Sequence, residues 1–270
     1  MKKLIYTAAA LAVMIMPAAV FAQSQQLTVP LSSPGKSFKL EAGLISGSIT
    51  VTAYDGKDIV IDAHSEGGRK EETEHKTGLR RLGDGDRLEI NAHENDNNVS
   101  VSSAMVNKQT DLIIKVPRTS GVFKISAVND GNIVVNNANG EFEVINVNGY
   151  IRMNNVSGSV VANTVNGDVK VTFRSVDAKA AMAFTTLNGD VDVTFPANFK
   201  ANAKLKSDAG DIYTDFNLVT NNRQPVAQKS GGKGLYKIKV DDWVYGKIDG
   251  GGPQVLMKNM NGSIYIRKSK

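Results

Sequence analysis

Apolar and polar residues alternate through the middle of the chain in a unit of nine residues that opens with a glycine. The glycines that open successive units are Gly131, Gly140, Gly149, Gly158 and Gly167. The second, fourth and seventh residues after the glycine are apolar, as at Ile133, Val135 and Ala138. Apolar residues two apart share one face of a strand, and the helical spacing of three and four is missing. The pattern therefore predicts a series of short strands, each with one buried face.

Asn-x-Asn-Gly phrases separate the predicted strands, for example from Asn137 to Gly140 and from Asn146 to Gly149. Asn and Gly tolerate positive φ, so each phrase predicts a corner. Parallel stacking of such units buries one continuous core, and two nine-residue units make a coil of 18 residues. The expected fold class is all-β, a parallel β-solenoid with about nine residues per half-coil. An antiparallel sandwich or barrel with tight hairpins is the competing interpretation.

The regularity of the repeat varies along one expected solenoid domain, residues 23–270. The repeats are irregular over 38–120, regular over 121–216, and followed by a loop and closing coils over 217–270. Gly189 and Gly210 come 22 residues after Gly167 and 21 residues after Gly189, which predicts two more full coils with wider corners.

Two polar stretches interrupt the repeat, and the chain ends on a good copy of it. Ser65–Arg87 is predicted to be a solvated excursion between strands, with a protruding binding loop or an acidic metal patch as the alternative. Asn221–Gly234 is predicted to be a long loop. The final repeat, around Gly262 and Ile264, would expose a strand edge that recruits other chains. We expect Trp243 or the 221–234 loop to cover it.

The first 22 residues have the parts of an export signal: two lysines, an apolar run, and a small-residue cleavage site before Gln23. We predict a signal peptide over residues 1–22 and an extracytoplasmic location, whether periplasmic, cell-surface or secreted. A membrane anchor is the alternative, although the apolar run is short for a span. No second run of spanning length occurs in the sequence, so no integral membrane segment is expected in the mature chain.

Composition narrows the chemistry further. The chain has no cysteine, which excludes disulfides, thiolate chemistry and a lipid-bearing cysteine. It carries 32 basic and 27 acidic residues; without Lys2 and Lys3 the balance is 30 to 27, a net charge of +3. This excess is mild and scattered, and aromatic residues make up 6% of the chain, so no nucleic-acid partner is expected.

The chain resembles the bacterial putative-adhesin family of β-strand-repeat proteins in three phrases: VNDGNIVVNNANGEFEVINVNGYIRMNNVSGSVVANTVNGDVKV, TTLNGDVDV, and the strand ending in LIIKVP. The resemblance covers about Phe38–Ile266 and is strongest over Leu112–Val193. It implies a right-handed β-helix-like fold and export, in a family known mainly as a domain of unknown function. The family offers no catalytic motif to match, so no catalytic residue is assigned.

The third residue after each full-coil glycine should point outward, because it lies between two apolar positions. These residues are Val134, Arg152, Lys170, Asp192 and Tyr213. The last four, which combine an acid, two bases and an aromatic ring, are the candidate ligand-binding residues for a repetitive partner such as a glycan. Polysaccharide lyases and hydrolases also use acids and bases on neighbouring coils, so a carbohydrate-active enzyme is the alternative. Mixed charge on this face also serves solubility, and pairing of Lys170 with Asp192 is an ordinary stabiliser.

Metal sites and amide ladders are the remaining candidates at the corners. Asp168, Asp190 and Asp211 each follow a coil glycine, and stacked carboxylates about 4.8 Å apart would repel unless a cation or lysines lay among them. The corners lack the recurring aspartate of calcium-binding nonapeptide repeats, and the three histidines do not supply a converging zinc site. No metal and no cofactor is expected. Asn ladders are expected to join Asn137 to Asn155 and Asn146 to Asn163.

The expected function is non-enzymatic: an adhesin-like binding or scaffold protein that presents a flat face to a polysaccharide or another cell-surface component. A purely structural envelope protein, which binds other chains through its ends, is a further alternative to the carbohydrate-active enzyme. The sequence leaves the ligand and the oligomeric state open.

Overall fold

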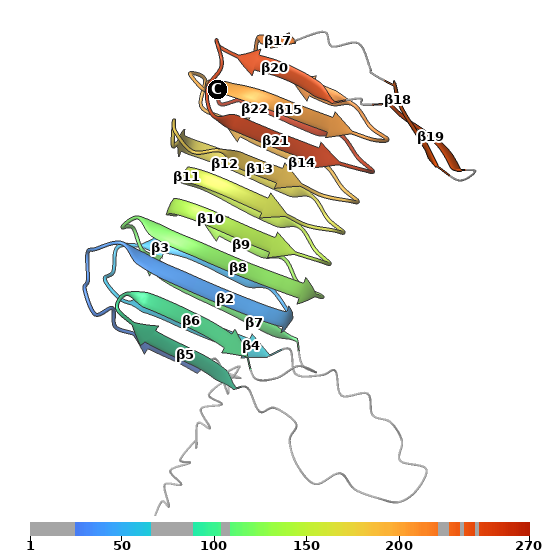
Figure 1. The fold of residues 1–270 in the computed structure, drawn as a ribbon. Coiled ribbons are helices and arrows are strands. Elements are labelled where there is room, and N and C mark those ends of the chain that lie inside the picture. Colours follow the sequence, from blue (N-terminus) through green and yellow to red (C-terminus); the bar gives the residue numbers. More distant parts are fainter. Residues whose placement is uncertain (1–24, 66–88, 104–108, 221–226, 233–234, 241–242) are drawn as a thin grey trace, which may run out of the picture.

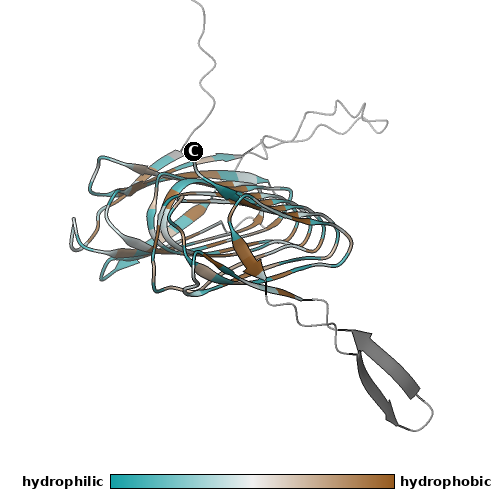
Figure 2. Cartoon of the chain, turned by 90° about the horizontal axis from the view of Figure 1, so that it is seen from above, coloured by the Kyte–Doolittle hydropathy of each residue, from teal (hydrophilic) through white to brown (hydrophobic). Residues whose placement is uncertain are grey.

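The strands of the molecule stack one above another along a single axis (Figure 1). The computed structural model describes residues 25–65, 89–103, 109–220, 227–232, 235–240 and 243–270, and every regular element within them is a β-strand. Viewed from above, the coils outline a flattened tube (Figure 2). Most neighbouring strands are parallel. The all-β, solenoid-like class is therefore confirmed, and the antiparallel sandwich or barrel is wrong.

One wall of the tube is named the first sheet. Its strands, in spatial order, are β5 (Ile90–Asn95), β6 (Asn98–Ser103), β2 (Phe38–Ser46), β8 (Gly121–Asn129), β10 (Asn139–Asn146), the C-terminal part of β11 (Ile151–Asn163), β13 (Met182–Thr185), β21 (Gln254–Asn259), β15 (Ala201–Ser207), β20 (Val244–Ile248) and β17 (Leu218–Thr220).

The other wall is named the second sheet. Its strands, in spatial order, are β1 (Gln25–Val29), β4 (Ile59–Ser65), β7 (Thr110–Pro117), β3 (Ile49–Tyr54), β9 (Ile133–Asn136), the N-terminal part of β11, β12 (Val169–Val176), β14 (Val191–Phe195), β22 (Ile264–Lys268) and β16 (Ile212–Thr214). Because β11 runs through a corner from the second sheet into the first, 20 strands are hydrogen-bonded as one continuous sheet.

Both walls of the tube turn most of their apolar residues inward and most of their polar residues outward. On β10, for example, Phe142 and Val144 are buried while Glu141, Glu143 and Ile145 are exposed. Buried aromatic rings stack between coils in the same interior, with Phe123 and Phe142 4.6 Å apart between ring centroids. Each strand therefore contributes one face to a shared apolar core, as a repeat too small to fold alone requires.

The coils do not stack in sequence order at either end of the tube. The last coil, β21 and β22, lies between the coil of β13 and β14 and the coil of β15 and β16. In the same way β2 and β3 lie between β6 and β7 on one side and β8 and β9 on the other. The prediction that the final repeat closes the stack is wrong. Since every coil offers the same parallel ladder above and below, a coil from the end of the chain can fill an inner position.

Antiparallel strands cover the two ends of the stack. At one end β1 pairs with β4, β4 with β7, and β5 with β6; at the other β20 pairs with β15 and β17. Trp243 lies directly before β20, and the Nζ atom of Lys204 on β15 stands 4.4 Å from its ring centroid. The expectation that Trp243 or the 221–234 loop covers the final repeat is wrong, because β15 and β16 lie against β21 and β22. The expected loop at Asn221–Gly234 is wrong in part, because β18 (Ala227–Gly232) pairs with β19 (Leu235–Val240) as a hairpin. The predicted signal peptide and residues 66–87 of the predicted excursion lie outside the described residues.

Asparagine amides form hydrogen-bonded ladders at the corners, and the expected ladder between Asn137 and Asn155 is confirmed. Asn155 Nδ2 donates to Asn137 Oδ1 at 2.7 Å. The expected pairing of Asn146 with Asn163 is wrong: Asn163 lies opposite Ile145, and Asn146 Nδ2 donates to the carbonyl of Gly131 at 3.0 Å. The longest ladder joins Asn129, Asn148, Asn166, Asn188 and Asn261 through amide bonds of 2.7 to 3.1 Å.

Candidate functional site

The predicted outward residues form a row across the second sheet. Arg152 on β11 lies opposite Lys170 on β12, which lies opposite Asp192 on β14. Arg152 and Lys170 are exposed and Asp192 is half-buried, while their sequence neighbours Ile151, Val169, Val191 and Val193 are buried. The structure thus brings three of the four candidate residues together on one outer face.

Tyr213, the fourth candidate, is separated from Asp192 by an intervening strand. Its register partner is Tyr265 on β22, and Tyr265 lies opposite Asp192. The expectation that the coil of Gly210 follows the coil of Gly189 is wrong, because the C-terminal coil occupies the position between them. Tyr265 is itself the third residue after Gly262, so the rule that selected the other candidates could also have found it.

Two cations hold the carboxylate of Asp192. Arg267 Nε donates to Asp192 Oδ1 at 2.7 Å, and Lys170 Nζ lies 3.6 Å from Asp192 Oδ2. The hydrogen bond from Arg267 to Asp192 raises the pKa of the Arg267 guanidinium above its usual range. Both oxygens of the acid are therefore engaged, and the acid positions two long basic side chains at the surface.

Tyrosine rings extend the row toward the end of the sheet. Tyr213 and Tyr265 stack with their centroids 5.2 Å apart, and the guanidinium of Arg267 lies 4.9 Å from the Tyr265 centroid. The Tyr213 hydroxyl donates to Asp211 Oδ2 at 3.1 Å, and this hydrogen bond raises the pKa of Tyr213. At the other end of the row the guanidinium of Arg152 lies 4.9 Å from the ring centroid of Tyr150.

The aspartates after the coil glycines bind backbone amides of the next coil. Asp168 Oδ1 accepts from the Asp190 N–H at 2.8 Å, and Asp190 Oδ1 accepts from the Ser263 N–H at 2.7 Å. Ser263 lies between Asp190 and Asp211, so the predicted column of three adjacent carboxylates is wrong. Within the described part of the chain, no group of three or more His, Cys, Asp or Glu is arranged to hold a metal ion.

Side chains of the row and of the neighbouring aspartates line an open depression of about 410 Å³ on the second sheet. Its lining residues are Tyr150, Ile151, Arg152, Asp168, Lys170, Asp190, Asp192, Tyr265 and Arg267. Sequence reasoning missed Tyr150, Tyr265 and Arg267 as members of this group. Arg267 lies two residues beyond Tyr265 on the same outer face, so the strand alternation would have placed it there once β22 was assigned to this position.

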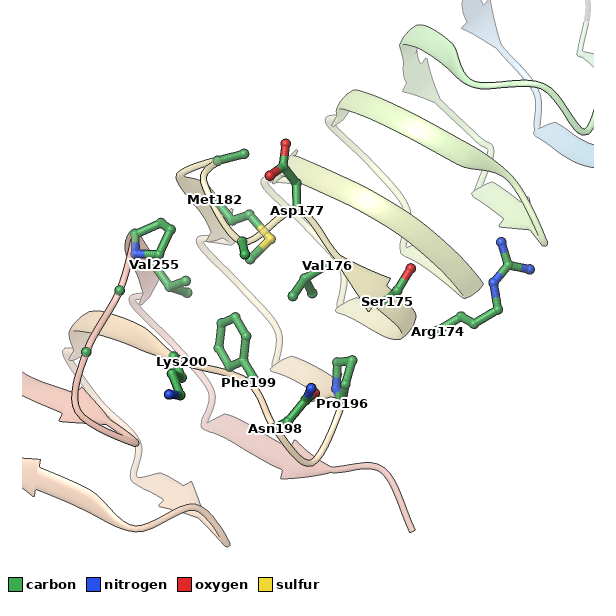
Figure 3. A pocket seen from close by; sticks show the side chains of 15 residues that line it. Arg174, Ser175, Val176, Asp177, Met182, Pro196, Asn198, Phe199, Lys200 and Val255 are labelled. Atoms are coloured by element: carbon green, nitrogen blue, oxygen red, sulfur yellow. The ribbon is translucent and has the colours of Figure 1, made fainter.

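A second hollow, of about 490 Å³, lies at the corner where β13, β15 and β21 begin (Figure 3). Val176, Pro196 and Phe199 contribute apolar walls, and Asp177 and Lys200 also line it. The coils are wider here than in the regular region: Val169 pairs with Val191, 22 residues on, whereas Ile151 pairs with Val169, 18 residues on. The hollow therefore lies where wide corners leave space between neighbouring turns.

Comparisons with known proteins agree with this fold. Residues 138–242 match the family Toastrack DUF4097. A putative cell adhesion protein from Clostridium sporogenes has a similar structure, with a TM-score of 0.52 and 12% identity over 92% of this chain and 99% of that chain. A putative adhesin from Bacteroides fragilis gives a TM-score of 0.25 and 10% identity over 92% of this chain and 97% of that chain, too low a score to carry an argument. No curated protein matches the chain.

At 12% identity the likeness to the Clostridium protein shows the fold alone. Within the described residues there is no helix of the length and apolarity needed to cross a bilayer. The resemblance indicated by the glycine and asparagine repeat is confirmed, because residues 138–242, which contain much of that repeat, are similar to the Toastrack DUF4097 family.

Proposed function

We propose that the chain is an exported, non-enzymatic, adhesin-like binding or scaffold protein, which presents the outer face of its second sheet to a repetitive partner such as a glycan. One observation carries the proposal: an in-register row of polar and aromatic side chains on five neighbouring strands. The row consists of Arg152, Lys170, Asp192, Tyr265 and Tyr213. Side chains repeated at the strand spacing of about 4.8 Å suit a partner that also repeats.

The chemistry of the row suits hydroxyl and carboxylate groups. Arginine and lysine donate to both, and a guanidinium positioned by a carboxylate and a ring face loses less freedom on binding. Arg267 has this environment between Asp192 and Tyr265. The name of the Clostridium sporogenes protein with a similar fold, a putative cell adhesion protein, agrees with a binding role.

The proposal has three further parts. The protein is located at the cell surface or in the periplasm, residues 23–270 form a single domain, and the coil is right-handed with about nine residues per half-turn. The regular ladder supports the coil length in the middle of the chain, where Gly140 lies opposite Gly158. The predicted signal peptide over residues 1–22 supports export.

Catalysis fits the site less well than binding. A general acid or base must exchange a proton with the substrate. The two oxygens of Asp192 contact Arg267 and Lys170, and an oxygen of Asp168 and of Asp190 binds a backbone N–H. The acids of this face thus stabilise the row, and we assign no catalytic residue.

The test is retention of the purified protein on insoluble polysaccharides and peptidoglycan, with the supernatant assayed for released sugars. We expect retention on at least one polymer without release. Lys170→Ala and Tyr265→Ala should each weaken retention about tenfold, because each removes a contact near the centre of the row. Lys124→Ala, which breaks an exposed ion pair with Glu143 on the first sheet, is the matched control and should bind as the native protein does.

Other outcomes of the retention experiment would favour another function or another binding surface. Released sugar would favour the carbohydrate-active enzyme. Absence of retention on every polymer, together with self-association that rises with concentration, would favour the structural envelope protein. Retention that Lys124→Ala weakens as much as Lys170→Ala would place binding outside the proposed row.

A further inference from the structure

The C-terminal end of the first sheet is basic and contains no acid in its strands. The five neighbouring strands β13, β21, β15, β20 and β17 are fully described and contain no Asp or Glu. Their lysines are Lys204 and Lys206 on β15, Lys247 on β20 and Lys258 on β21. These strands pack at the end of the tube farthest from β5 and β6 (Figure 1).

The alternation of the strands places all four lysines on the outer face, which we name the lysine face. Ala203 and Leu205 are buried on either side of Lys204, and Gly246 and Ile248 are buried on either side of Lys247. Lys258 is exposed between the buried residues Met257 and Asn259. The lysine face therefore points to solvent on the wall opposite the row of Arg152 and Lys170.

Two of the lysines lie directly opposite each other. Lys206 is the register partner of Lys258 on the neighbouring parallel strand. Like charges in directly opposite positions destabilise a sheet. Asp208, just beyond the end of β15, pairs with Lys206 at 3.0 Å and offsets part of the local charge.

Aromatic rings position the ammonium groups. Lys204 Nζ lies 4.4 Å from the Trp243 ring centroid and 6.0 Å from that of Tyr245, and Lys206 Nζ lies 5.9 Å from that of Trp243. Such contacts hold a cation at a defined place at the surface. Lysine groups held in this way lose less freedom when an anion binds.

The other half of the same sheet is electrically different. Lys124 on β8 pairs with Glu143 on β10 at 3.3 Å, and Lys39 pairs with Glu41 on β2 at 3.5 Å. Paired charges of opposite sign are the ordinary way to make a sheet surface soluble. The five strands of the lysine face contain no acid from which such pairs could form within the strands, and the acid that pairs with Lys206, Asp208, lies beyond the end of β15.

We propose that the lysine face is a second binding surface, whose partner is an anionic polysaccharide. Several ammonium groups on one face complement carboxylate or phosphate groups along a polymer, and a flat sheet can meet such a chain over several strands. The surface is separate from the row on the second sheet, and the two proposals can fail independently.

The probe is soluble polygalacturonate, a carboxylate-bearing polysaccharide, with neutral dextran for comparison. Trp243 is the single tryptophan of the chain and lies within the surface, so its fluorescence reports binding directly. We expect the full-length protein to bind polygalacturonate but not dextran, with affinity that falls as salt is added. The double variant Lys204→Gln/Lys258→Gln should bind about tenfold more weakly.

The controls separate this surface from everything else on the molecule. Lys39→Gln/Lys124→Gln removes the same charge from the other half of the first sheet and should bind polygalacturonate as the native protein does. An equal loss in this control would overturn the proposal. Loss of polygalacturonate binding in Lys170→Ala but not in Lys204→Gln/Lys258→Gln would place the binding on the row of the second sheet and would also overturn it. So would equal binding of dextran, or tighter binding to duplex DNA or to anionic phospholipid vesicles.

A last variant examines the two acids that precede Trp243 in the sequence, Asp241 and Asp242, which lie outside the described residues. Asp241→Asn/Asp242→Asn should bind polygalacturonate as tightly as the native protein or more tightly. Binding by this variant but not by the native protein would show that the lysine face is neutralised internally, and would overturn the proposal.

Discussion

Neighbouring coils approach each other so closely at their corners that only glycine fits there. A Cβ atom on Gly149, where φ is +153°, would stand 2.0 Å from the carbonyl oxygen of Gly131. A Cβ atom on Gly189, with φ of +145°, would stand 2.3 Å from the carbonyl oxygen of Gly167. Both the backbone conformation and the close approach of the next coil exclude a side chain. The spacing of the coils therefore depends on single residues.

Gly149→Ala should destabilise the protein by about 3 kcal/mol or more, because it combines a strained conformation with a clash against backbone. The melting temperature should fall by roughly 10 °C. Gly250→Ala is the matched control, since φ there is +87° but nothing lies within 4 Å of the added Cβ. It should cost about 1 kcal/mol. Equal melting temperatures for the two variants in thermal unfolding would contradict the packing argument.

A short clasp fastens the segment between β1 and β2 to the turn between β5 and β6. The Glu94 carboxylate accepts hydrogen bonds from Ser32 N at 3.0 Å, from Ser32 Oγ at 3.0 Å and from Asn97 N at 2.9 Å. The backbone bond from Ser32 is the main reason that the pKa of Glu94 is lowered. The clasp secures an end of the stack whose antiparallel strands otherwise have few neighbours.

The clasp should make stability depend on pH in the acid range. Because the folded-state pKa of Glu94 lies below its unfolded value, its contribution is present above the unfolded value and is lost as pH falls through the folded one. Glu94→Gln should therefore unfold at a lower temperature than the native protein at pH 7, and the two should converge in acid. A gap between the two melting temperatures that stays constant down to acid pH would argue against this role of the carboxylate.

The strands were predictable from the sequence, and the order in which they stack was not. Alternation located the buried faces of strands such as β10 and β14, and the glycine spacing predicted which half-coils lie opposite each other between Gly131 and Gly189. The wrong pairing of Asn146 with Asn163 came from a shift of one residue: Asn146 is equivalent to Thr164, whose Oγ1 donates to the carbonyl of Gly149 at 2.9 Å. Local patterns fix faces well and exact partners less well.

At the scale of the whole molecule, the missing information was the place of the terminal coils. Gly262 and Ile264 fit the repeat as well as Gly189 and Val191 do. Their local sequence pattern therefore does not predict which coils lie next to the final coil. Only side chains between coils distinguish the positions, such as the bond from Arg267 to Asp192 and the stack of Tyr265 on Tyr213. The same insertion completes the candidate binding row, which therefore combines residues from widely separated parts of the chain.

The chain holds no cysteine, so engineered pairs can report this arrangement without background. Asp192 and Tyr265 are register partners, which places their Cα atoms about 4.8 Å apart, within the range of a disulfide. Asp192 and Tyr213 lie two strands apart, at about 10 Å, which is too far.

The most direct measurement is peptide mapping of two oxidised double variants under non-reducing conditions. The inserted coil predicts that Asp192→Cys/Tyr265→Cys forms its disulfide in the folded protein and that Asp192→Cys/Tyr213→Cys stays reduced. A disulfide in the second variant and none in the first would mean that the coils stack in sequence order, and would contradict both the fold and the binding row built on it.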